Sequence, residues 1–386
     1  MLLDTYDLTD AGFWARDDAY TILDEIRGEG AVQRHESGQE GPLWAVLTHR
    51  ESLAVLGDAK TYSSQGGSLL GTGYGPPAGA GRMMALSDPP KHRAYRDPVM
   101  PFFSARRANG LEERIRDLTE GVIERLLVRE KIDFVKDIGA VVPLTVMCDL
   151  MGIPDEDRDE IVAMCDQAFL GRNPAERRAA HQRLLPYLLQ LAMERKAAPG
   201  DDVISALAAD LELDEVVLNC DNIIVGGIQT VRHTAAMAML SLVRNTDAWR
   251  ELDGKADPKL ATEELLRWTS VGLHVLRTAK TDTELAGQRI KAGDRVVVWT
   301  PGANRDTAVF EEPHRLDLNR HPNRHIAFGW GEHYCIGGPL ARTELRVLFT
   351  ELSRLVAEVE PLGEPEYNSS IINFGLDSFP VRLHRR

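Results

Sequence analysis

Apolar residues recur at helical spacing along most of the chain. Side chains three and four positions apart lie on one face of an α-helix, so this spacing predicts amphipathic helices. The predicted helices cover residues 19–26, 51–56, 106–127, 144–151, 156–170, 174–196, 203–211, 214–243 and 259–269. Short runs typical of strands are found at 43–47, 275–278, 283–285 and 295–299, and a pair of strands is expected within 371–383. Many helices with small strand clusters indicate a mostly α fold with minor β.

The helix predicted over 214–243 differs from the others because it is apolar on nearly every face. A helix of this kind lies in the middle of a large fold. Gly226 and Gly227 interrupt it, at a cost of about 1 kcal/mol each relative to alanine. We expect a ligand that lies against the helix backbone to be the reason for these two glycines.

The composition is that of a soluble globular protein, with 43% apolar and 27% charged residues. The length of 386 residues would allow two or three domains, but no repeat or long linker is visible, so we expect one domain over 1–386. A net charge of −14 without a continuous basic stripe argues against nucleic acid as a partner. No signal peptide and no apolar run of ~20 residues is visible, so we expect a cytoplasmic protein without membrane attachment.

The four cysteines are widely spaced, which argues against zinc ribbons and disulfide frameworks and fits a reducing compartment. One of them, Cys335, lies in the glycine-rich stretch Phe-Gly-Trp-Gly-Glu-His-Tyr-Cys-Ile-Gly at 328–337. Glycines let the backbone pass close to a large flat ligand. A helical pattern begins at Leu340, and the N–H groups at a helix start favour an anion such as a thiolate. A buried structural cysteine is the simpler interpretation, and a nucleophile paired with His333 is another, although a nucleophile needs no such glycine lining.

The stretch is similar to the haem-binding loop of the cytochrome P450 (haem-thiolate) family, Phe-Gly-x-Gly-x-[His/Arg]-x-Cys-x-Gly, and every fixed position is filled. The resemblance implies the cytochrome P450 fold, with haem b between the central oxygen-binding helix and the helix that follows the cysteine loop. Cys335 would be the thiolate ligand of the iron, where its sulfur favours O–O cleavage. Phe328, Gly329, Ile336 and Gly337 would contact the haem.

Five basic or imidazole residues match positions that bind the haem propionates in this family. They are His92 and Arg96, four apart on one helix face, together with Arg277, His325 and His333. Two carboxylates inside a protein require cationic or hydrogen-bonding partners. Each residue alone would more often be a surface group or a satisfied histidine, but five matching positions favour the haem.

Glu264 and Arg267 fit the Glu-x-x-Arg motif of the family. Positions i and i+3 share a helix face, so carboxylate and guanidinium can interact. An exposed pair of this kind contributes only a few tenths of a kcal/mol. In the family the pair is buried and gains a third, basic partner, for which we expect Arg315, with Arg320 as the competitor.

The central helix carries Gly226-Gly227-Ile228-Gln229-Thr230-Val231 where the family favours Ala/Gly-Gly-x-Asp/Glu-Thr-Thr. Thr230 keeps the hydroxyl that serves dioxygen activation. Gln229 replaces the acid, and an amide orients water but has no ionised form with which to shuttle a proton at neutral pH. Protons would then arrive through water or a substrate group, or the enzyme would catalyse an oxidation other than simple oxygen insertion.

Six residues are expected in the wall of the substrate pocket by their family positions: Asn222, Ile223, Val271, His274, Ile372 and Asn373. Residues 66–81 contain seven glycines and are either a disordered loop or a lid over the pocket. The polar members of the wall indicate a substrate with hydrogen-bonding groups.

The resemblance implies a monooxygenase that inserts one oxygen atom of O2 into a C–H bond of a small-to-medium organic substrate, in bacterial natural-product biosynthesis. The alternatives are oxidative coupling or cyclisation, and peroxide-driven oxidation. No flavin or nicotinamide domain is visible, so electrons from NAD(P)H are expected through a ferredoxin and its reductase, with Arg93, Arg106, Arg107, Arg342 and Arg346 as candidates for the docking face. A haem sensor or carrier is the non-enzymatic alternative, but it needs no hydroxyl such as that of Thr230. We expect a monomer.

Overall fold

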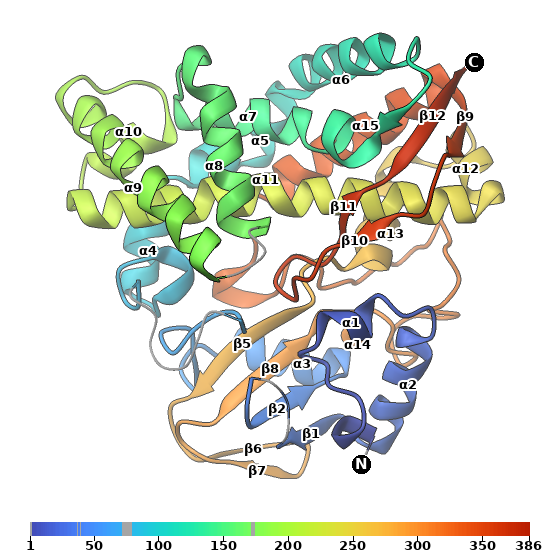
Figure 1. Cartoon of the computed structure of the whole chain (residues 1–386). Coiled ribbons are helices and arrows are strands. Elements are labelled where there is room, and N and C mark those ends of the chain that lie inside the picture. The colour runs from blue at the N-terminus through green and yellow to red at the C-terminus, as the bar shows by residue number, and fades with distance from the viewer. Residues whose placement is uncertain (1, 37, 39, 72–78, 171–173) are drawn as a thin grey trace.

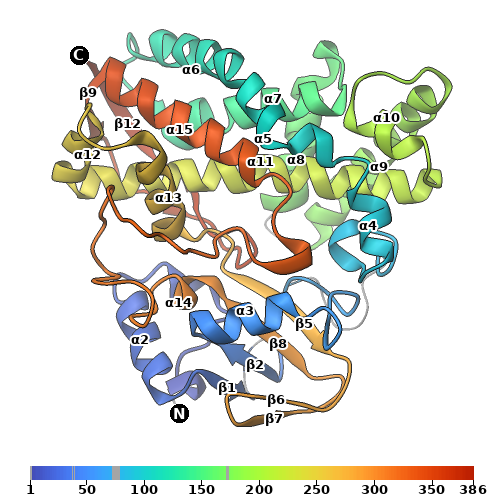
Figure 2. The same cartoon turned by 180° about the vertical axis from the view of Figure 1, so that it is seen from behind.

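The structure is a computed structural model that describes residues 2–36, 38, 40–71, 79–170 and 174–386. A helical part and a part rich in β-strands lie one above the other (Figure 1), and the view from behind shows the same division (Figure 2). The glycine-rich stretch at 66–81 is described only at its two ends, so the prediction of a lid lies partly outside the described residues.

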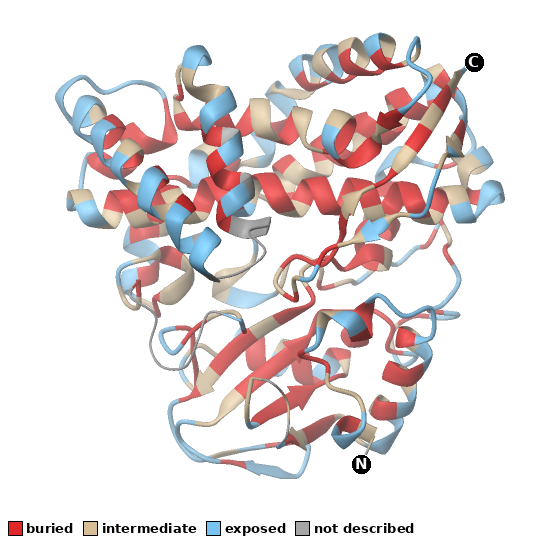
Figure 3. Ribbon diagram, viewed as in Figure 1, coloured by how far each residue is buried: buried red, intermediate tan, exposed pale blue. Residues whose placement is uncertain are grey.

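The helical part contains α4–α13 and α15. Their bounds are α4 Lys91–Arg96, α5 Ala105–Gly110, α6 Glu112–Leu126, α7 Val141–Met151, α8 Arg158–Leu170, α9 Pro174–Ala197, α10 Val203–Ala208, α11 Leu213–Arg244, α12 Thr246–Leu252, α13 Pro258–Thr269 and α15 Gly338–Leu355. The long helix α11 crosses the whole part (Figure 1), and most of its residues are buried (Figure 3). This matches the apolar central helix that the sequence predicts over 214–243.

The strand-rich part is built on a five-stranded sheet in the order β1-β2-β8-β5-β3. The strands are β1 Val32–His35, β2 Leu43–Val46, β8 Arg295–Trp299, β5 His274–Ala279 and β3 Tyr62–Ser63. β2 and β8 pair in parallel, and the other neighbours pair antiparallel. Four helices accompany the sheet: α1 Ala11–Trp14, α2 Ala19–Glu29, α3 His49–Gly57 and α14 Thr300–Ala303.

Three smaller sheets complete the fold: a three-stranded sheet β4-β12-β9 and the pairs β6-β7 and β10-β11. Their bounds are β4 Ile132–Asp133, β6 Thr283–Leu285, β7 Gln288–Ile290, β9 Val356–Pro361, β10 Glu366–Tyr367, β11 Leu376–Ser378 and β12 Pro380–Arg385. The strand pair expected within 371–383 is thus partly wrong, because residues 371–375 form no strand. Side chains hold this segment instead: Ser370 N–H donates to Asn368 Oδ1, and Ile372 N–H donates to Ser370 Oγ.

The two glycines of α11 have different environments. A Cβ on Gly227 would lie 2.7 Å from the sulfur of Met147, so this glycine permits the close packing of α11 on α7. A Cβ on Gly226 would meet nothing within 4 Å. Gly226 therefore leaves open space beside the helix, as the expected ligand requires.

Candidate active site

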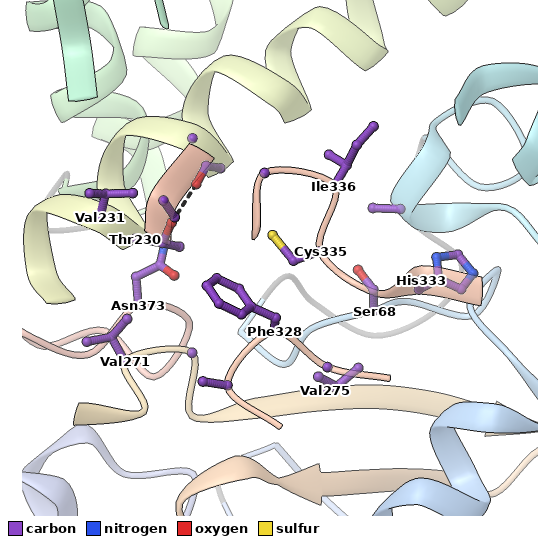
Figure 4. Close-up of a pocket in the computed structure, with 18 of the residues that line it drawn as sticks. Ser68, Thr230, Val231, Val271, Val275, Phe328, His333, Cys335, Ile336 and Asn373 are labelled. Atoms are coloured by element: carbon purple, nitrogen blue, oxygen red, sulfur yellow. Dashed lines mark hydrogen bonds between the residues drawn. The ribbon is translucent and has the colours of Figure 1, made fainter. Parts of the chain in front are cut away.

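A cavity of about 410 Å³ lies between α11, the loop before α15, and strand β5 of the five-stranded sheet. Figure 4 shows the sulfur of Cys335 pointing into this cavity, with Thr230 of α11 across from it and Phe328 between them. The sequence-predicted residues that line it are His92, Arg96, Asn222, Ile223, Gly226, Gly227, Thr230, Val271, His274, Arg277, Phe328, Gly329, His333, Cys335, Ile336, Gly337, Ile372 and Asn373.

The loop that carries Cys335 is fixed by its own backbone and by α3. Cys335 N–H donates to the carbonyl of Phe328 at 2.9 Å, which closes the loop. Gly331 has φ +75°, and a Cβ there would lie 2.4 Å from the carbonyl oxygen of Leu56 on α3. Only glycine fits this position, because a side chain would strain the backbone and collide with α3.

The surroundings of Cys335 act on the pKa of its thiol in two opposite directions. Burial raises the pKa of the thiol, whereas N–H groups of Gly337 and Gly338 and the charges of Arg96 and Arg342 favour the thiolate. The other three cysteines of the chain are buried, whereas the Cys335 side chain is open to the cavity. Among the described residues, no group of three or more His, Cys, Asp or Glu side chains could hold a metal ion.

Four cationic or imidazole groups face the cavity without carboxylate partners in the described part of the chain. His92 is fully buried, and both of its ring nitrogens have no hydrogen-bond partner there. Arg277 is 3% exposed and donates only to the carbonyl of Leu276, while Arg96 donates to the carbonyl of Tyr334. The fourth group is His333, whose ring lies 4.2 Å from that of His92, centroid to centroid, and whose Nε2 lies 3.1 Å from Ser64 Oγ.

Burial sets the protonation of these groups. It lowers the pKa of Arg277 to about 10 and of His333 to about 3, and it lowers the pKa of His92 as well. Two arginines and two imidazoles without acids, of which Arg277 and His92 are buried, form an excess of hydrogen-bond donors and positive charge. An anionic ligand with two carboxylates fits this excess, so the residues present fit haem.

His325 does not belong to this group, and its predicted role as a propionate ligand is wrong. Its Nε2 lies 2.9 Å from Glu263 Oε2, and its Nδ1 accepts from Ala327 N–H. Both ring nitrogens are therefore engaged within the protein, and the residue does not line the cavity. Glu263 also accepts from Arg342, and these two partners hold the pKa of the Glu263 carboxyl down at about 2, against burial.

The Glu-x-x-Arg pair is fully buried, and its third partner is Arg320. Arg267 donates two hydrogen bonds to Glu264, at 2.7 and 2.8 Å, and Arg320 Nε donates to Glu264 Oε2 at 3.1 Å. The expectation for Arg315 is wrong, because its side chain is exposed and pairs with Glu312. Arg315 contributes its backbone carbonyl instead, which accepts from both other arginines.

Gln229 and Thr230 are neighbours in sequence but point in different directions. Gln229 is fully buried and does not line the cavity. Its side chain therefore does not lie where it could act directly in catalysis, as the sequence led us to expect. Thr230 lines the cavity, and its hydroxyl donates to the carbonyl of Gly226 at 2.8 Å (Figure 4). The lone pairs of the Thr230 oxygen stay available to a water or ligand.

His274 uses its polar atoms within the protein. Its Nε2 accepts from Leu70 N–H at 2.7 Å, and its Nδ1–H donates to the carbonyl of Ile371 at 3.1 Å. Burial lowers the pKa of His274 to about 4, so the ring is neutral at pH 7 and Nε2 can accept. His274 therefore joins two walls of the cavity rather than offering a free group to a substrate. Asn222 and Asn373 remain as open amides in the wall.

Replacing His274 with phenylalanine is expected to loosen the wall at Leu70. The Leu70 N–H would be left buried without a partner, at a cost of about 1–3 kcal/mol, or roughly a ten- to hundredfold faster amide exchange. Hydrogen exchange of the Leu70 amide measures this. The Met84 amide, which donates to Asn219 Oδ1, is the internal control and should not change. Unchanged exchange at Leu70 would show that the imidazole does not hold this wall.

The same histidine gives a pH dependence. Its folded pKa is depressed, so the unfolded chain binds the proton more readily. The contribution of His274 to stability is therefore complete above its ordinary pKa of 6.5 and declines as the pH falls toward 4.

Several cavity residues escaped the sequence analysis, and Glu344 of α15 is the most unusual of them. It shares a helix face with Leu340 and Leu348, both of which are buried. A carboxyl group within an apolar helix face is unusual, and this pattern in the sequence could have pointed to Glu344.

Among the described residues, no helix has both the length and the apolar character needed to cross a bilayer.

Comparisons with known proteins agree with one another. The cytochrome P450 family model matches residues 259–369. Cytochrome P450 NovI of Streptomyces niveus is 33% identical over 394 residues, which covers 99% of this chain and 97% of NovI. Linalool 8-monooxygenase of Pseudomonas putida is 31% identical and covers 98% of both chains. The crystal structure of P450 OxyD, which is involved in the biosynthesis of vancomycin-type antibiotics, matches with a TM-score of 0.92 at 35% identity, over 98% of this chain and 100% of that chain.

Proposed function

The chain belongs to the cytochrome P450 family and is a haem-thiolate monooxygenase, and from this premise we propose that Cys335 is the ligand of the haem iron. The family, the mostly helical fold and the cofactor that the sequence indicated are confirmed. The assignment of Cys335 is supported above all by its place in one cavity with Arg96 and Arg277, which pair with no carboxylate in the described part of the chain, and with the unpartnered ring of His92. No other cysteine of the chain is open to that cavity.

We assign the haem propionates to the four groups described above: His92, Arg96, Arg277 and His333. Arg96 and Arg277 supply charge, and the neutral imidazole of His92 supplies an N–H donor, whereas His333 Nε2 already lies 3.1 Å from Ser64 Oγ. Phe328, Gly329, Ile336 and Gly337 would contact the macrocycle from the cysteine loop, and Gly226 leaves room for a ligand on the α11 side.

When bound, haem supplies the dioxygen activation through which one oxygen atom enters a substrate C–H bond and the other leaves as water. The protein positions the substrate and controls water and protons. Thr230 offers its hydroxyl oxygen to the cavity as an acceptor, and the apolar wall around Ile223, Val271 and Ile372 keeps bulk water out. Asn222 and Asn373 are the wall groups that can orient a polar substrate.

We favour hydroxylation of a natural product as the reaction. OxyD, with the TM-score of 0.92, takes part in antibiotic biosynthesis, and two open amides in the wall suit a substrate with hydrogen-bonding groups. A panel of such compounds would be screened for a substrate-induced spin shift and then turned over under ¹⁸O2. A product with one labelled oxygen atom supports hydroxylation, whereas an oxidised product without the label favours coupling or cyclisation.

The electron donor is proposed to be a ferredoxin with its reductase. Four of the five arginines suggested for docking already pair with acids of this chain: Arg93 with Glu332, Arg107 with Asp201, Arg342 with Glu263, and Arg346 with Glu112. Arg106 of α5 is exposed, and so is Trp330 within the cysteine loop. These two residues are therefore the better candidates for a docking contact.

Thr230→Val is expected to uncouple turnover. Valine has the same shape but no hydroxyl, so the fold stays while product per NAD(P)H oxidised falls about tenfold, a loss equivalent to 1.4 kcal/mol. Product and NAD(P)H consumption are measured together. Thr145→Val is the matched control, because Thr145 of α7 also donates to a carbonyl four residues earlier but does not line the cavity. Equal coupling in the two variants would remove Thr230 from the catalytic assignment.

Peroxide-driven oxidation is the second candidate, and the amide at Gln229 is the observation that favours it. Peroxide brings both electrons and both protons, so it needs no acid at that position. Product formation with hydrogen peroxide, and none with ferredoxin and reductase, would support peroxide-driven oxidation.

A further inference from the structure

The loop between β10 and β11 fixes the backbone of Asn373. Asn368 Nδ2 donates to the carbonyl of Asn373 at 2.8 Å, and the N–H of Phe374 donates to the carbonyl of Val271 at 2.9 Å. The ring of Phe374 stacks on that of Tyr367, with the ring centroids 5.6 Å apart. These contacts do not use the side-chain amide of Asn373, so the loop holds this amide in place without depending on it.

The amide of Asn373 is buried, opens into the cavity and has no partner in the described part of the chain. The residue is 8% exposed and lines the cavity. Its hydrogen bonds within the described chain all use its backbone. Because a buried donor and a buried acceptor without partners are costly, we expect a molecule in the cavity to supply both partners.

Asn373 lies on the α11 side of the cavity. In Figure 4 its side chain points toward α11, from which Thr230 faces the cavity. Gly375 of the same loop packs on His233, which follows Thr230 by three residues: a Cβ on Gly375 would lie 2.6 Å from Cγ of His233. Since the proposed haem lies between α11 and α15, the amide faces the space in which a substrate would lie.

Among the described residues, no side chain with a full charge lines the α11 side of the cavity. His274 is the titratable group there; both of its ring nitrogens are engaged, and its pKa of about 4 keeps it neutral at pH 7. An ionised substrate group would therefore lose its water without gaining a counter-ion. The other titratable groups of the cavity wall are assigned to the propionates or lie on the cysteine loop and α15, across the proposed haem: His92, Arg96, Arg277, His333, Cys335 and Glu344.

We propose that Asn373 selects an uncharged substrate with an amide group whose N–H and C=O lie on the same edge, as in a primary carboxamide or a lactam. The Nδ2–H of Asn373 donates to the substrate carbonyl, and the substrate N–H donates to Asn373 Oδ1, so both halves of the side chain gain a partner. An ester has no N–H donor, and a carboxylate has no donor and carries a charge. This inference rests on the proposed monooxygenase function and names the substrate class of the same site.

Matched probes test this selection through the spin shift that they induce in the wild-type holoenzyme. The probes are phenylacetamide, naphthylacetamide and biphenylacetamide, each with its methyl ester and its carboxylate, and a phenyl-substituted lactam with its lactone. The amides that fit the cavity are expected to bind at least about tenfold more tightly than the matching esters, because an ester leaves the buried acceptor of Asn373 without a donor. Amides that bind no more tightly than their esters, or a series in which no amide binds, would overturn the proposal.

Two variants of Asn373 separate hydrogen bonding from shape. Asn373→Leu removes both polar groups, and Asn373→Asp keeps the shape but replaces the N–H donor with a negative charge. Both variants should lose the preference for amide over ester, while the Kd of the ester in Asn373→Leu should stay within about twofold of the wild-type value. A loss of coupling in Asn373→Leu with unchanged Kd values would instead make Asn373 a ligand of water, against the proposal.

Asn222→Leu is the matched comparison, because Asn222 is the other open amide of the wall. It precedes Thr230 by eight residues of α11, a rise of about 12 Å along the helix, so its replacement should keep the preference for amide over ester. Loss of the preference in Asn222→Leu, with the preference kept in Asn373→Leu, would contradict the assignment of Asn373.

The carbonyl spectrum of the reduced holoenzyme separates this inference from the proposed function. A thiolate-type spectrum without any preference for amides would overturn the inference for Asn373 alone. A spectrum without the thiolate signature would instead overturn the proposed function.

Discussion

Replacing Cys335 with histidine is expected to reduce monooxygenation with ferredoxin and reductase to below about one thousandth, a loss of about 4 kcal/mol in transition-state stabilisation. Imidazole can still hold haem, but it lacks the negative sulfur whose electron density favours O–O cleavage. The N–H groups of Gly337 and Gly338 that now favour the thiolate would lose their acceptor. The measurement is product formed per haem, so that loss of cofactor is separated from loss of chemistry.

Cys148→Ala is the control for Cys335→His. Cys148 of α7 is fully buried, and burial raises the pKa of its thiol to about 11, so it remains a neutral thiol. Its replacement should affect stability alone and leave the activity per haem intact. Activity of Cys335→His near the wild-type level would contradict the assignment of the iron ligand.

Glu264→Gln is expected to have the largest effect on stability. Glu264 and Arg267 have no exposed side-chain surface, and Arg320 is the third member of the cluster. Removing the negative charge leaves two buried guanidinium groups facing each other, and breaking a buried pair costs about 3–5 kcal/mol. We expect a lower urea midpoint and reduced haem content after expression.

Arg315→Ala tests whether Arg315 stabilises the same cluster through its side chain or only through its backbone carbonyl. The Arg315 side chain is 68% exposed, and only its carbonyl accepts from the buried arginines, so the free energy of unfolding should change by no more than about 0.5 kcal/mol. A large loss in this variant together with a small loss in Glu264→Gln would reverse our assignment of the third partner.

The spacing of residues within a single loop or helix was enough to predict those parts of the site that one segment forms by itself. The order of glycines around Cys335 and the i, i+3 spacing of Glu264 and Arg267 are set within one loop and one helix. The same holds for the long apolar helix, whose predicted range of 214–243 agrees with Leu213–Arg244. Such features need no knowledge of how distant segments pack.

Partners from irregular segments could not be predicted in this way. Arg315 and Arg320 lie in the same irregular stretch, and which of them reaches Glu264 depends on the path of the chain there. His325 matched a sequence position, but Glu263, far away in sequence, is its partner. The direction of Gln229 was similarly hidden, because adjacent residues of a helix point to different sides.

The account depends on a thiolate bond between Cys335 and the haem iron, and the absorption spectrum of the reduced, carbon-monoxide-treated holoenzyme tests it most directly. We predict the red-shifted Soret maximum of a thiolate-ligated carbonyl adduct in the wild type, and its loss in Cys335→His. An imidazole-type maximum in the wild type, or the same thiolate-type maximum in both proteins, would contradict the account.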